Sequence, residues 1–348
     1  MGHETTVEPM PIQAAIRRVV EGDHLSETEA RDVAAAIMDG AATPAQIAGL
    51  LVALRAKGES IDEILGFARA MRARAERVEA PPDVVDTCGT GGDGRGTFNI
   101  STVAAFVAAG AGCRVAKHGN RAVSGGCGSA EMLEALGVPI EVEPAAAERL
   151  LEQVGIAFLF APRYHPAARL AATPRREIGV RSIFNIVGPL TNPAGARRQL
   201  VGVFDPRLVE PVAQVLARLG AERALVVHGS DGLDEITLTG PSRVAELHEG
   251  KVRTSEIDPA RLGFARCAPA ELAGGAPEEN ARIAREVLAG RRGPARDVVL
   301  LNAGAAIRVA GRAATLALGI GRARKSIDSG SALAKLDALV STHGSSHA

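Results

Sequence analysis

The chain has 348 residues, and its forty lysine and arginine side chains balance forty aspartate and glutamate side chains. A net charge of zero produces no overall attraction to nucleic acid or to an anionic membrane, and with 3% aromatic residues the chain has few side chains on which bases could stack. Hydrophobic residues make up 46% of the sequence, enough for a large core, and the length predicts two domains or one large domain with an appendage.

The cysteines are scattered along the chain, at Cys88, Cys113, Cys127 and Cys267, and none belongs to a C-x-x-C pair. This spacing disfavours a zinc site or a redox motif and predicts free thiols in a reducing compartment. No apolar run is long enough to predict a membrane span, and the first residues lack the apolar core of a signal peptide. We therefore expect a cytoplasmic protein without a membrane partner.

Residues 11 to about 76 are predicted to form four helices. Three helix starts carry the capping-box pattern, in which a hydroxyl residue precedes a glutamate or glutamine by three positions: Ser26 with Glu29, Thr43 with Gln46, and Ser60 with Glu63. Glycines stand near the ends of the preceding helices, where a left-handed residue is favoured: Gly22, Gly40 and Gly58. The segment carries no candidate chemistry, so we interpret it as a packing or dimer-forming module.

After a linker at residues 79–82, strands and helices alternate. The predicted strands are 84–87, 113–116, 156–160 and 225–228, with a hairpin formed by 244–247 and 252–254. The predicted helices are 101–109, 130–136, 278–288 and 331–340, and residues 298–301 are either a strand or the start of a helix. The alternation predicts a mostly parallel sheet covered by helices, in which ligands bind beyond the carboxyl ends of the strands.

The first segment beyond a strand is the glycine-rich run from Asp86 to Gly94, which leads into a helix near Ser101. Glycines let several backbone N–H groups approach an anion, and a helix N-terminus attracts negative charge. The run therefore predicts a phosphate or pyrophosphate cradle, with a plain surface turn as the alternative. It also contains G-x-G-x-x-G, but no acidic residue follows about 20 positions later and no Gly-Lys-Ser occurs, so a nicotinamide cofactor and ATP hydrolysis are disfavoured.

Two further segments follow predicted strands. Residues 117–131 combine two cations, a histidine, an amide and hydroxyls with several glycines, which is typical of a polyanion-binding loop, although a lone histidine such as His118 is more often structural. Residues 231–235 place carboxylates after a strand, a set of ligands that suits Mg²⁺, with a solvated acidic turn as the alternative. We expect all three segments to converge on one edge of the sheet.

Two other stretches are candidates for shaping a ligand site. Arg175 lies in a basic stretch, where one guanidinium could bind a carboxylate through two hydrogen bonds and the other arginines are expected to be solvated. Residues 184–193 contain two prolines after apolar residues, which predicts a rigid turn that forms a pocket wall.

Together and in this order, these segments resemble the anthranilate phosphoribosyltransferases of tryptophan biosynthesis. The resemblance runs from the helical N-terminus to about Leu339 and is most specific at 86–94, 99–102, 117–124, 175–179, 184–193 and 234–235. It implies a nucleoside phosphorylase-like α/β fold, with a small all-helical domain at 1–78, joined by helices from about 162–190, and a larger α/β domain at 79–345 with a central, mostly parallel sheet covered by helices. It also implies a homodimer formed through the helical domain.

The resemblance implies transfer of the phosphoribosyl group of phosphoribosyl pyrophosphate to the amine of anthranilate, with Mg²⁺ as cofactor, giving N-(5-phosphoribosyl)anthranilate and pyrophosphate. The implied substrate-binding residues are Gly89, Thr90, Gly91, Gly92, Asp93, Thr97, Asn99, Ser101, Thr102, Lys117, Asn120, Arg121, Ser129, Arg175 and Pro189. The implied catalytic residues are Lys117, His118 and Arg175, and the implied metal ligands are Ser101, Asp234 and Glu235. Arg175 would hold the anthranilate carboxylate. The chain departs from the family pattern at Gly125, Gly126 and Cys127, where hydroxyl and basic residues are usual, so fewer side-chain donors reach the phosphates there.

Two alternatives share this fold. A pyrimidine nucleoside phosphorylase would have a Lys-His-Ser type of run near the first strand, and this sequence has none there. A non-catalytic nucleic-acid-binding relative would have a strongly basic surface and would lack the residues implied to contact anthranilate. This chain instead has zero net charge and retains His118, Asn120 and Arg175, so no nucleic-acid partner is expected.

Overall fold

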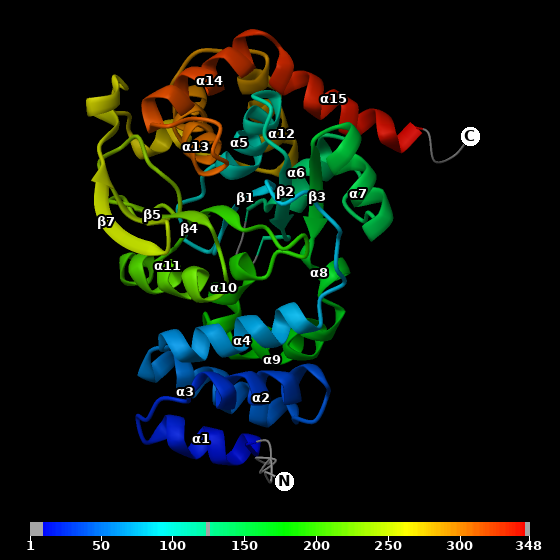
Figure 1. Cartoon of the computed structure of the whole chain (residues 1–348), viewed down its shortest axis with the longest axis vertical. Coiled ribbons are helices and arrows are strands. Elements are labelled where there is room, and N and C mark those ends of the chain that lie inside the picture. The colour runs from blue at the N-terminus through cyan, green and yellow to red at the C-terminus, as the bar shows by residue number, and fades with distance from the viewer. Residues whose placement is uncertain (1–9, 123–125, 345–348) are drawn as a thin grey trace. The chain divides into compact units, whose positions relative to one another are not determined.

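The computed structural model describes residues 10–122 and 126–344, and the chain divides into two compact units (Figure 1). The first unit comprises Met1–Ala75 with His165–Thr191, and the second comprises Glu76–Tyr164 with Asn192–Ala348. Gly125, one of the positions where the sequence departs from the family pattern, lies outside the described residues. Within the described residues, no helix combines the length and the apolar character that a membrane crossing requires.

The regular elements in the described part of the first unit are all helices. Its first segment forms α1 (Ile12–Val20), α2 (Glu27–Met38), α3 (Pro44–Lys57) and α4 (Ile61–Ala73), and its second forms η1 (Pro166–Ala171), α9 (Ala172–Ile178), α10 (Ile183–Val187) and η2 (Gly188–Leu190). The two segments pack together, with α9 against α3 and α10 against α4. At the second of these contacts Phe67 and Phe184 meet edge to face, with ring centroids 5.7 Å apart.

Local signals determine where these helices begin and end. All three predicted capping boxes are confirmed: the side chains of Ser26, Thr43 and Ser60 each accept a hydrogen bond from the backbone N–H three residues on, and the side chain of that later residue accepts one from the backbone N–H of the capping residue. The predicted glycines at the preceding helix ends have positive φ angles of 92°, 77° and 91°, at Gly22, Gly40 and Gly58 respectively.

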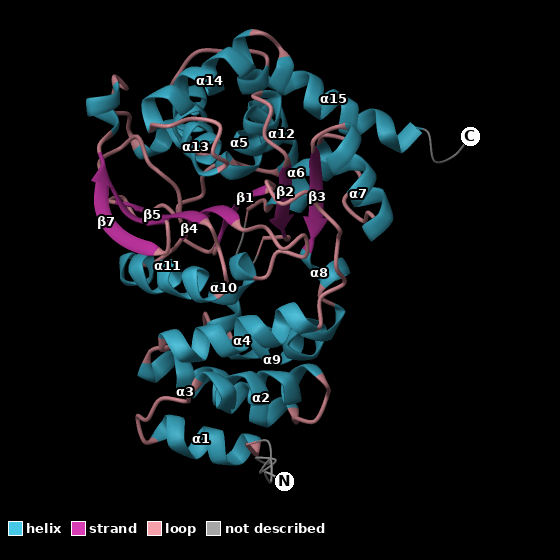
Figure 2. Ribbon diagram, viewed as in Figure 1, coloured by secondary structure: helices cyan, strands magenta, loops and turns pink. Residues whose placement is uncertain are grey.

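The second unit is built on a seven-stranded sheet in the order β3-β2-β1-β4-β5-β6-β7 (Figure 2). The strands are β1 (Val85–Gly89), β2 (Val115–Gly119), β3 (Ile156–Phe160), β4 (Arg198–Gly202), β5 (Arg223–Gly229), β6 (Ser242–His248) and β7 (Lys251–Ile257). The first five in chain order pair in parallel, and β6 and β7 extend the sheet as an antiparallel hairpin. The predicted mostly parallel sheet is therefore confirmed.

Helices flank this sheet. They are α5 (Ile100–Gly110), α6 (Ser129–Ala135), α7 (Pro144–Gln153), α8 (Ala161–Tyr164), α11 (Val209–Arg218), α12 (Pro277–Leu288), α13 (Pro294–Val309), α14 (Leu316–Asp328) and α15 (Ser331–Gly344). Short 3₁₀ turns occur at η3 (Pro206–Leu208), η4 (Pro259–Leu262) and η5 (Pro269–Leu272). Residues 298–301, which the sequence leaves open between strand and helix, lie inside α13. The sequence does not predict β4, α7, α11 or α14.

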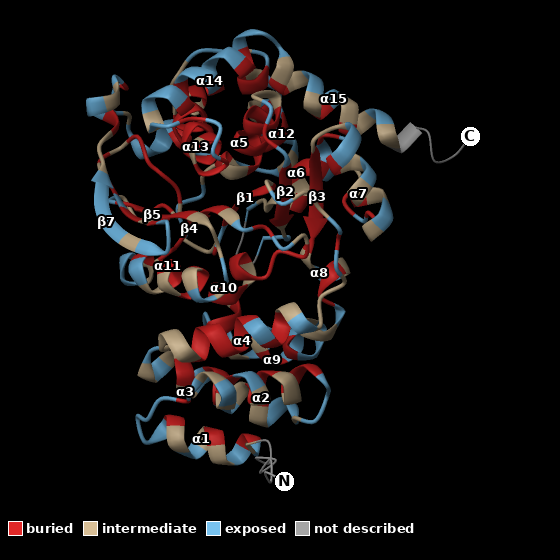
Figure 3. Cartoon of the chain, viewed as in Figure 1, coloured by how far each residue is buried: buried red, intermediate tan, exposed pale blue. Residues whose placement is uncertain are grey.

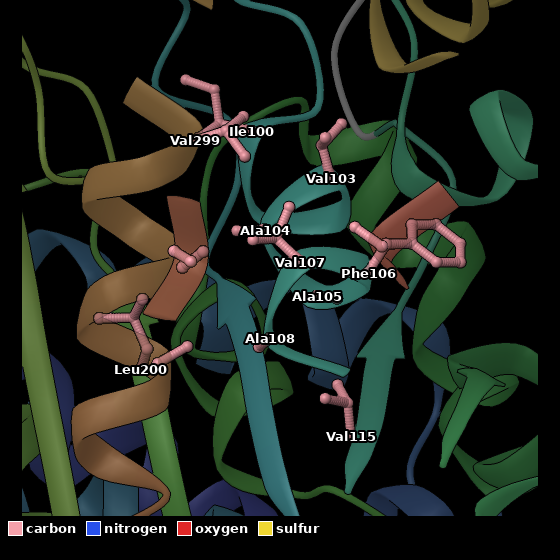
Figure 4. Close-up of a cluster of buried hydrophobic side chains, with 14 of the residues drawn as sticks. Ile100, Val103, Ala104, Ala105, Phe106, Val107, Ala108, Val115, Leu200 and Val299 are labelled. Atoms are coloured by element: carbon pink, nitrogen blue, oxygen red, sulfur yellow. The ribbon is translucent and has the colours of Figure 1, made fainter. Parts of the chain in front are cut away.

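The core of this unit surrounds α5, which is buried along nearly its whole length (Figure 3). Ile100, Phe106 and Val107 of this helix pack in one cluster with Leu200 of β4 and side chains of α13 (Figure 4). Because α5 begins immediately beyond the glycine-rich run after β1, this packing fixes the position of its N-terminus. The core thus holds the N-terminus of α5 beside the glycine-rich run, where the sequence predicts an anion-binding site.

Helices α13 and α14 cross where two glycines face each other. A Cβ atom added at Gly319 would lie 2.2 Å from the carbonyl oxygen of Gly304. A Cβ added at Gly304 would lie 2.7 Å from the backbone nitrogen of Ile320. The crossing therefore has no space for a side chain at either position.

Candidate active site

A cavity of about 410 Å³ opens in the α/β unit beyond the carboxyl ends of β1 and β2. All three segments that the sequence expects to converge contribute to its lining. The sequence-predicted residues that line it are Gly89, Thr90, Gly91, Gly92, Asp93, Thr97, Asn99, Ser101, Thr102, Lys117, His118, Asn120, Arg121, Ser129, Asp234 and Glu235. Gly126 and Cys127, two of the positions that depart from the family pattern, also line it.

The glycine-rich run is held against β4 and against Asp234, which with Glu235 forms the acidic pair of the pocket. The backbone N–H of Thr90 donates to the carbonyl of Gly202 (2.9 Å), and its hydroxyl accepts from the N–H of Phe204 (3.0 Å). Next in the chain, Gly91 has a φ of 63° and donates its N–H to Oδ2 of Asp234 at 2.8 Å. A side chain at Gly202 would collide with the carbonyl oxygen of Asp234, because an added Cβ would lie 1.5 Å from it.

Three carboxylates gather at this place. Asp93 accepts a hydrogen bond from the backbone N–H of Asp234 (3.3 Å), and Glu235 accepts one from the N–H of Ser101 at the start of α5 (3.1 Å). Burial is the main cause that raises the pKa of both Asp234 and Glu235 above the usual carboxyl range, and repulsion from the neighbouring carboxylate adds to it. Buried acids that repel each other in this way are suited to binding a cation.

The oxygen atoms of this site fit Mg²⁺, which prefers oxygen ligands. A protein-bound Mg²⁺ usually keeps several water ligands and also binds phosphate oxygens of the substrate. Asp234, Glu235 and the hydroxyl of Ser101 provide oxygen atoms in the pocket lining. Among the described residues there is no group of three or more His, Cys, Asp or Glu side chains that could hold a metal ion. The remaining ligands would therefore have to come from the hydroxyl, from water and from a bound phosphate.

Lys117 is a buried cation in the pocket lining. Its Nζ donates to the backbone carbonyl of Thr87 and to Oγ of Ser101, the latter at 3.2 Å. Burial lowers the pKa of Lys117, and neighbouring carboxylates, Asp86 above all, oppose that shift. A cation in such a poorly hydrated site interacts strongly with any anion that enters the pocket.

Asp86 is a fully buried acid near this lysine. Its Oδ1 accepts from the N–H of His118 (3.1 Å), and its Oδ2 accepts from the amide Nδ2 of Asn192 (2.8 Å). Burial raises the pKa of Asp86 to about 6, against the opposing attraction of Lys117 and these two hydrogen bonds. The sequence places Asp86 in the glycine-rich run but does not predict its contact with Asn192.

The segment after β2 is only partly free to bind a ligand. The guanidinium of Arg121 makes two 2.7 Å hydrogen bonds to Glu134 and lies over the ring of Phe160. The hydroxyl of Ser129 donates to the backbone carbonyl of Asn120 at 3.1 Å. Both side chains line the pocket, but each already has a partner within the protein.

Arg175 and Pro189 belong to the helical unit and are not among the residues that line this pocket. Arg175 lies on α9 and Pro189 on η2. The guanidinium carbon of Arg175 lies 5.3 Å from the centre of the Phe184 ring, a cation–π contact. Burial lowers the pKa of Arg175, and no carboxylate among the described residues forms an ion pair with it.

Sequence reasoning missed one wall of the pocket. Gly274 and Gly275 line it, and the N–H of Gly274 donates to the carbonyl of Gly96 at 2.8 Å. Thr97 pairs with Ala273 in an isolated antiparallel bridge. The adjacent glycines just before the predicted helix at 278–288 were the available signal, since such a pair permits a close backbone approach.

Comparison with known proteins places the chain in a class. The family model described as the glycosyl transferase family helical bundle domain matches residues 13–75, and that described as the glycosyl transferase family a/b domain matches residues 81–333. An anthranilate phosphoribosyltransferase of Moorella thermoacetica is 61% identical over 94% of this chain and 97% of its own length. The fold is thus that of a two-domain glycosyl transferase.

Solved structures agree with this assignment. The crystal structure of the anthranilate phosphoribosyltransferase of Thermus thermophilus has a TM-score of 0.89 at 46% identity, covering 94% of this chain and 98% of that one. The Saccharomyces cerevisiae enzyme in complex with PRPP and Mg has a TM-score of 0.86 at 28% identity, covering 95% of this chain and 98% of that one. The same enzyme in complex with 4-fluoroanthranilate has a TM-score of 0.85 at 27% identity, covering 96% of this chain and 98% of that one. The chain belongs to the anthranilate phosphoribosyltransferase family.

Proposed function

We propose that this protein transfers the phosphoribosyl group of phosphoribosyl pyrophosphate to the amine of anthranilate, a step of tryptophan biosynthesis that gives N-(5-phosphoribosyl)anthranilate and pyrophosphate. The observation that carries this proposal is a single pocket in which a glycine-rich turn, a helix N-terminus, a buried lysine and an acidic pair meet. These are the groups that a pyrophosphate ester with its divalent cation requires. The yeast relative solved with PRPP and Mg supports it.

The direct test is the fluorescence of anthranilate with the purified protein. We expect the signal to fall only when anthranilate, phosphoribosyl pyrophosphate and Mg²⁺ are all present. Pyrophosphate release, measured with a coupled pyrophosphatase assay, should match the anthranilate consumed one for one. Pyrophosphate release without loss of anthranilate would contradict the proposed acceptor, and no release at all would contradict the proposed reaction.

Electrostatic stabilisation of the leaving group is one task proposed for the pocket. Breaking the bond from ribose C1 to pyrophosphate builds negative charge on the leaving oxygens. We assign the phosphoribosyl pyrophosphate to residues on the turn, at the start of α5 and after β2: Gly89, Thr90, Gly91, Gly92, Asp93, Thr97, Asn99, Ser101, Thr102, Lys117, Asn120, Arg121 and Ser129. Lys117 is proposed as the catalytic cation, because a desolvated positive charge stabilises such an anion more than a solvated one does.

Mg²⁺ is proposed to bind at Ser101, Asp234 and Glu235, where it would supply further neutralisation of the pyrophosphate charge. The raised pKa values of the two acids support this assignment, because a cation would remove their mutual repulsion. We expect the double variant Asp234→Asn with Glu235→Gln to need a higher Mg²⁺ concentration for half-maximal activity. Glu256→Gln, an isosteric change at an exposed position of β7, is the control. An unchanged Mg²⁺ titration would remove this assignment.

Anthranilate is proposed to be held by Arg175, through its carboxylate, with His118, Asn120 and Pro189 along its path and His118 in a catalytic role. The aromatic amine is uncharged at neutral pH, so the reaction needs no strong base before attack, and holding two reactants in line is the larger contribution. A guanidinium that already stacks on Phe184 and has no ion-pair partner among the described residues is suited to a planar aromatic acid.

Arg175→Ala should raise the KM for anthranilate at least tenfold while changing that for phosphoribosyl pyrophosphate less than about threefold, because a charged hydrogen bond contributes about 1.5–3 kcal/mol. Arg176→Ala, at the exposed neighbouring position, is the matched control and should change neither KM. Initial rates with each substrate varied in turn would give both constants. Equal changes in the two KM values for Arg175→Ala would exclude the proposed role.

We also propose a cytoplasmic homodimer formed through the helical unit. On α1 and α3, which pack against each other, Val20 and Val52 are 69% and 44% exposed. Exposed apolar side chains on adjacent helices favour burial against a second copy. Light scattering should give a dimer mass for the protein and a monomer mass for the double variant Val20→Asp with Val52→Asp. The four cysteines are all free thiols, which supports a reducing compartment.

A further inference from the structure

Asn280 lies on α12, outside the pocket lining, and its residue is 1% exposed. Its amide nevertheless connects two walls of the pocket. The oxygen Oδ1 accepts a hydrogen bond from the backbone N–H of Gly275 (2.8 Å), and the nitrogen Nδ2 donates to Oδ1 of Asn99 (3.0 Å). A side chain outside the cavity therefore holds groups that line it.

The connection continues through Asn99. Its Nδ2 donates to the backbone carbonyl of Cys127 at 2.9 Å, and the thiol of Cys127 lies 3.6 Å from the Oδ1 of Asn99 as a weak donor. Three hydrogen bonds thus run in series from Gly275 through Asn280 and Asn99 to Cys127. We call this series the amide relay. It joins the segments 274–275, 99–102 and 126–128, which lie far apart in the sequence and line the same cavity.

The direction of the amide relay is determined by its two ends. A backbone N–H can only donate, so Asn280 must present its oxygen to Gly275 and its nitrogen to Asn99. A backbone carbonyl can only accept, so Asn99 must present its nitrogen to Cys127 and its oxygen to Asn280. Both amides are therefore held in one orientation, and neither can rotate by 180° without placing two donors or two acceptors opposite each other.

Asn99 has a second reason to need such support. It is the residue before α5, but its side chain forms no capping hydrogen bond to that helix. Its side-chain hydrogen bonds go instead to α12 and to the segment after β2. The position of this amide at the helix N-terminus, beside Ser101 and Thr102, is thus set by tertiary contacts rather than by the helix itself.

We propose that Asn280 is a positioning residue for the binding of phosphoribosyl pyrophosphate, acting through Asn99 and Gly275 on the shape of the pocket. The inference rests on the proposed function. Its specific content is that Asn280 serves the pyrophosphate substrate and not anthranilate, and that it does so through Asn99.

Asn280→Asp is the sharpest variant, because it retains the shape and the acceptor for Gly275 but replaces the donor to Asn99 with a second acceptor. Whichever way Asn99 then turns, one link of the amide relay is lost. Losing one buried hydrogen bond corresponds to about a tenfold change in an equilibrium constant. We expect the KM for phosphoribosyl pyrophosphate to rise about tenfold, with the KM for anthranilate and kcat changed less than about twofold.

A double-mutant cycle tests whether the effect passes through Asn99. In the background of Asn99→Ala the relay is already broken, so adding Asn280→Asp should change the KM for phosphoribosyl pyrophosphate less than about twofold. Glu286→Gln on the same helix exchanges a carboxylate and an amide at an exposed ion pair with Arg282, and it should leave all constants unchanged. Circular dichroism and thermal unfolding verify that each variant is folded.

The outcomes separate this inference from the proposed function. Wild-type protein that does not consume anthranilate contradicts the proposed function. If the wild type is active, any one of three results overturns the positioning role: Asn280→Asp leaves the KM for phosphoribosyl pyrophosphate unchanged, changes the KM values of both substrates equally, or has the same effect in the wild-type and Asn99→Ala backgrounds. If Asn280→Asp does not fold, Asn280→Ala replaces it in the same cycle, and the same three results overturn the inference.

Discussion

Asp86 is a buried acid whose surroundings affect how the protein responds to pH. It is fully buried, and its two oxygens already accept hydrogen bonds from His118 and Asn192. Its pKa of about 6 exceeds the 3.8 of an unperturbed aspartate, so the folded state binds this proton more tightly than the unfolded state does. Its contribution to stability is therefore present below about pH 4 and is lost as the pH rises through about 6.

Asp86→Asn should remove this pH dependence. Two pKa units at about 1.4 kcal/mol each amount to about 3 kcal/mol between pH 4 and 7. The variant also carries a constant cost, because its new amide nitrogen faces the amide nitrogen of Asn192. We expect the wild type to lose free energy of unfolding relative to the variant as the pH rises from about 4 to about 7, as measured by urea unfolding at each pH. Parallel curves for the two proteins would contradict the assigned pKa.

At the scale of residues, sequence reasoning finds the groups near a strand end but not the groups that hold them. Lys117 and Asp234 follow strands, and parallel strands share one edge, so their convergence is predictable. Asn192 lies 106 positions along the chain from its partner Asp86. Asn280 lies 181 positions from its partner Asn99. Nothing in the local pattern records such a pairing. An asparagine on the buried side of α12 was the only signal, since a buried amide needs partners.

The crossing of α13 and α14 gives a prediction at the scale of elements. Gly319→Ala should lower the free energy of unfolding by about 1–3 kcal/mol, because its Cβ would meet the carbonyl oxygen of Gly304 at 2.2 Å and the helices would have to separate. Gly321→Ala on the same helix has nothing within 4 Å, and it should be neutral or stabilising by up to about 1 kcal/mol. Urea unfolding of both variants provides the comparison. Equal effects would show that the two helices are not in close contact.

Elements specified by local chemistry are the ones that the sequence predicts best. The capping boxes at Ser26, Thr43 and Ser60 mark three helix starts, since the groups that satisfy each helix end lie within four residues. Strand β4 is not predicted, because its short apolar run follows two arginines and becomes a central strand only by pairing with β1 and β5. The sequence cannot decide whether residues 298–301 form a helix or a strand, because a buried helix and a buried strand are both apolar throughout.

At the scale of the molecule, the helical unit is assembled from two stretches of chain separated by the segment from β1 to α8. The second stretch contributes more than surface contacts. Phe184 packs on Phe67, and the carbonyl of Leu190 accepts a hydrogen bond from Nε of Arg72 at 2.7 Å. Burial also lowers the pKa of Arg72 to about 10, so this hydrogen bond compensates a desolvated charge.

A fragment of residues 10–78 should therefore be less stable than the same fragment joined by a flexible linker to residues 165–191. We expect the joined fragment to unfold in one cooperative thermal transition, followed by circular dichroism at 222 nm, and the shorter one to lose its signal gradually. The physical reason is that the shorter fragment leaves the apolar faces of α3 and α4 exposed to water. Identical transitions would contradict a structural role for the second stretch.

This split arrangement has a consequence for how the protein is made. A ribosome adds about 5–20 residues per second, so about 5–20 seconds pass between release of α4 and release of α10. During that interval the emerging N-terminal helices lack the ring of Phe184, and the strands synthesised meanwhile must not engage them. Completion of the smaller unit thus waits on translation of a large part of the other one, and until then the apolar faces of α3 and α4 lack their native partners.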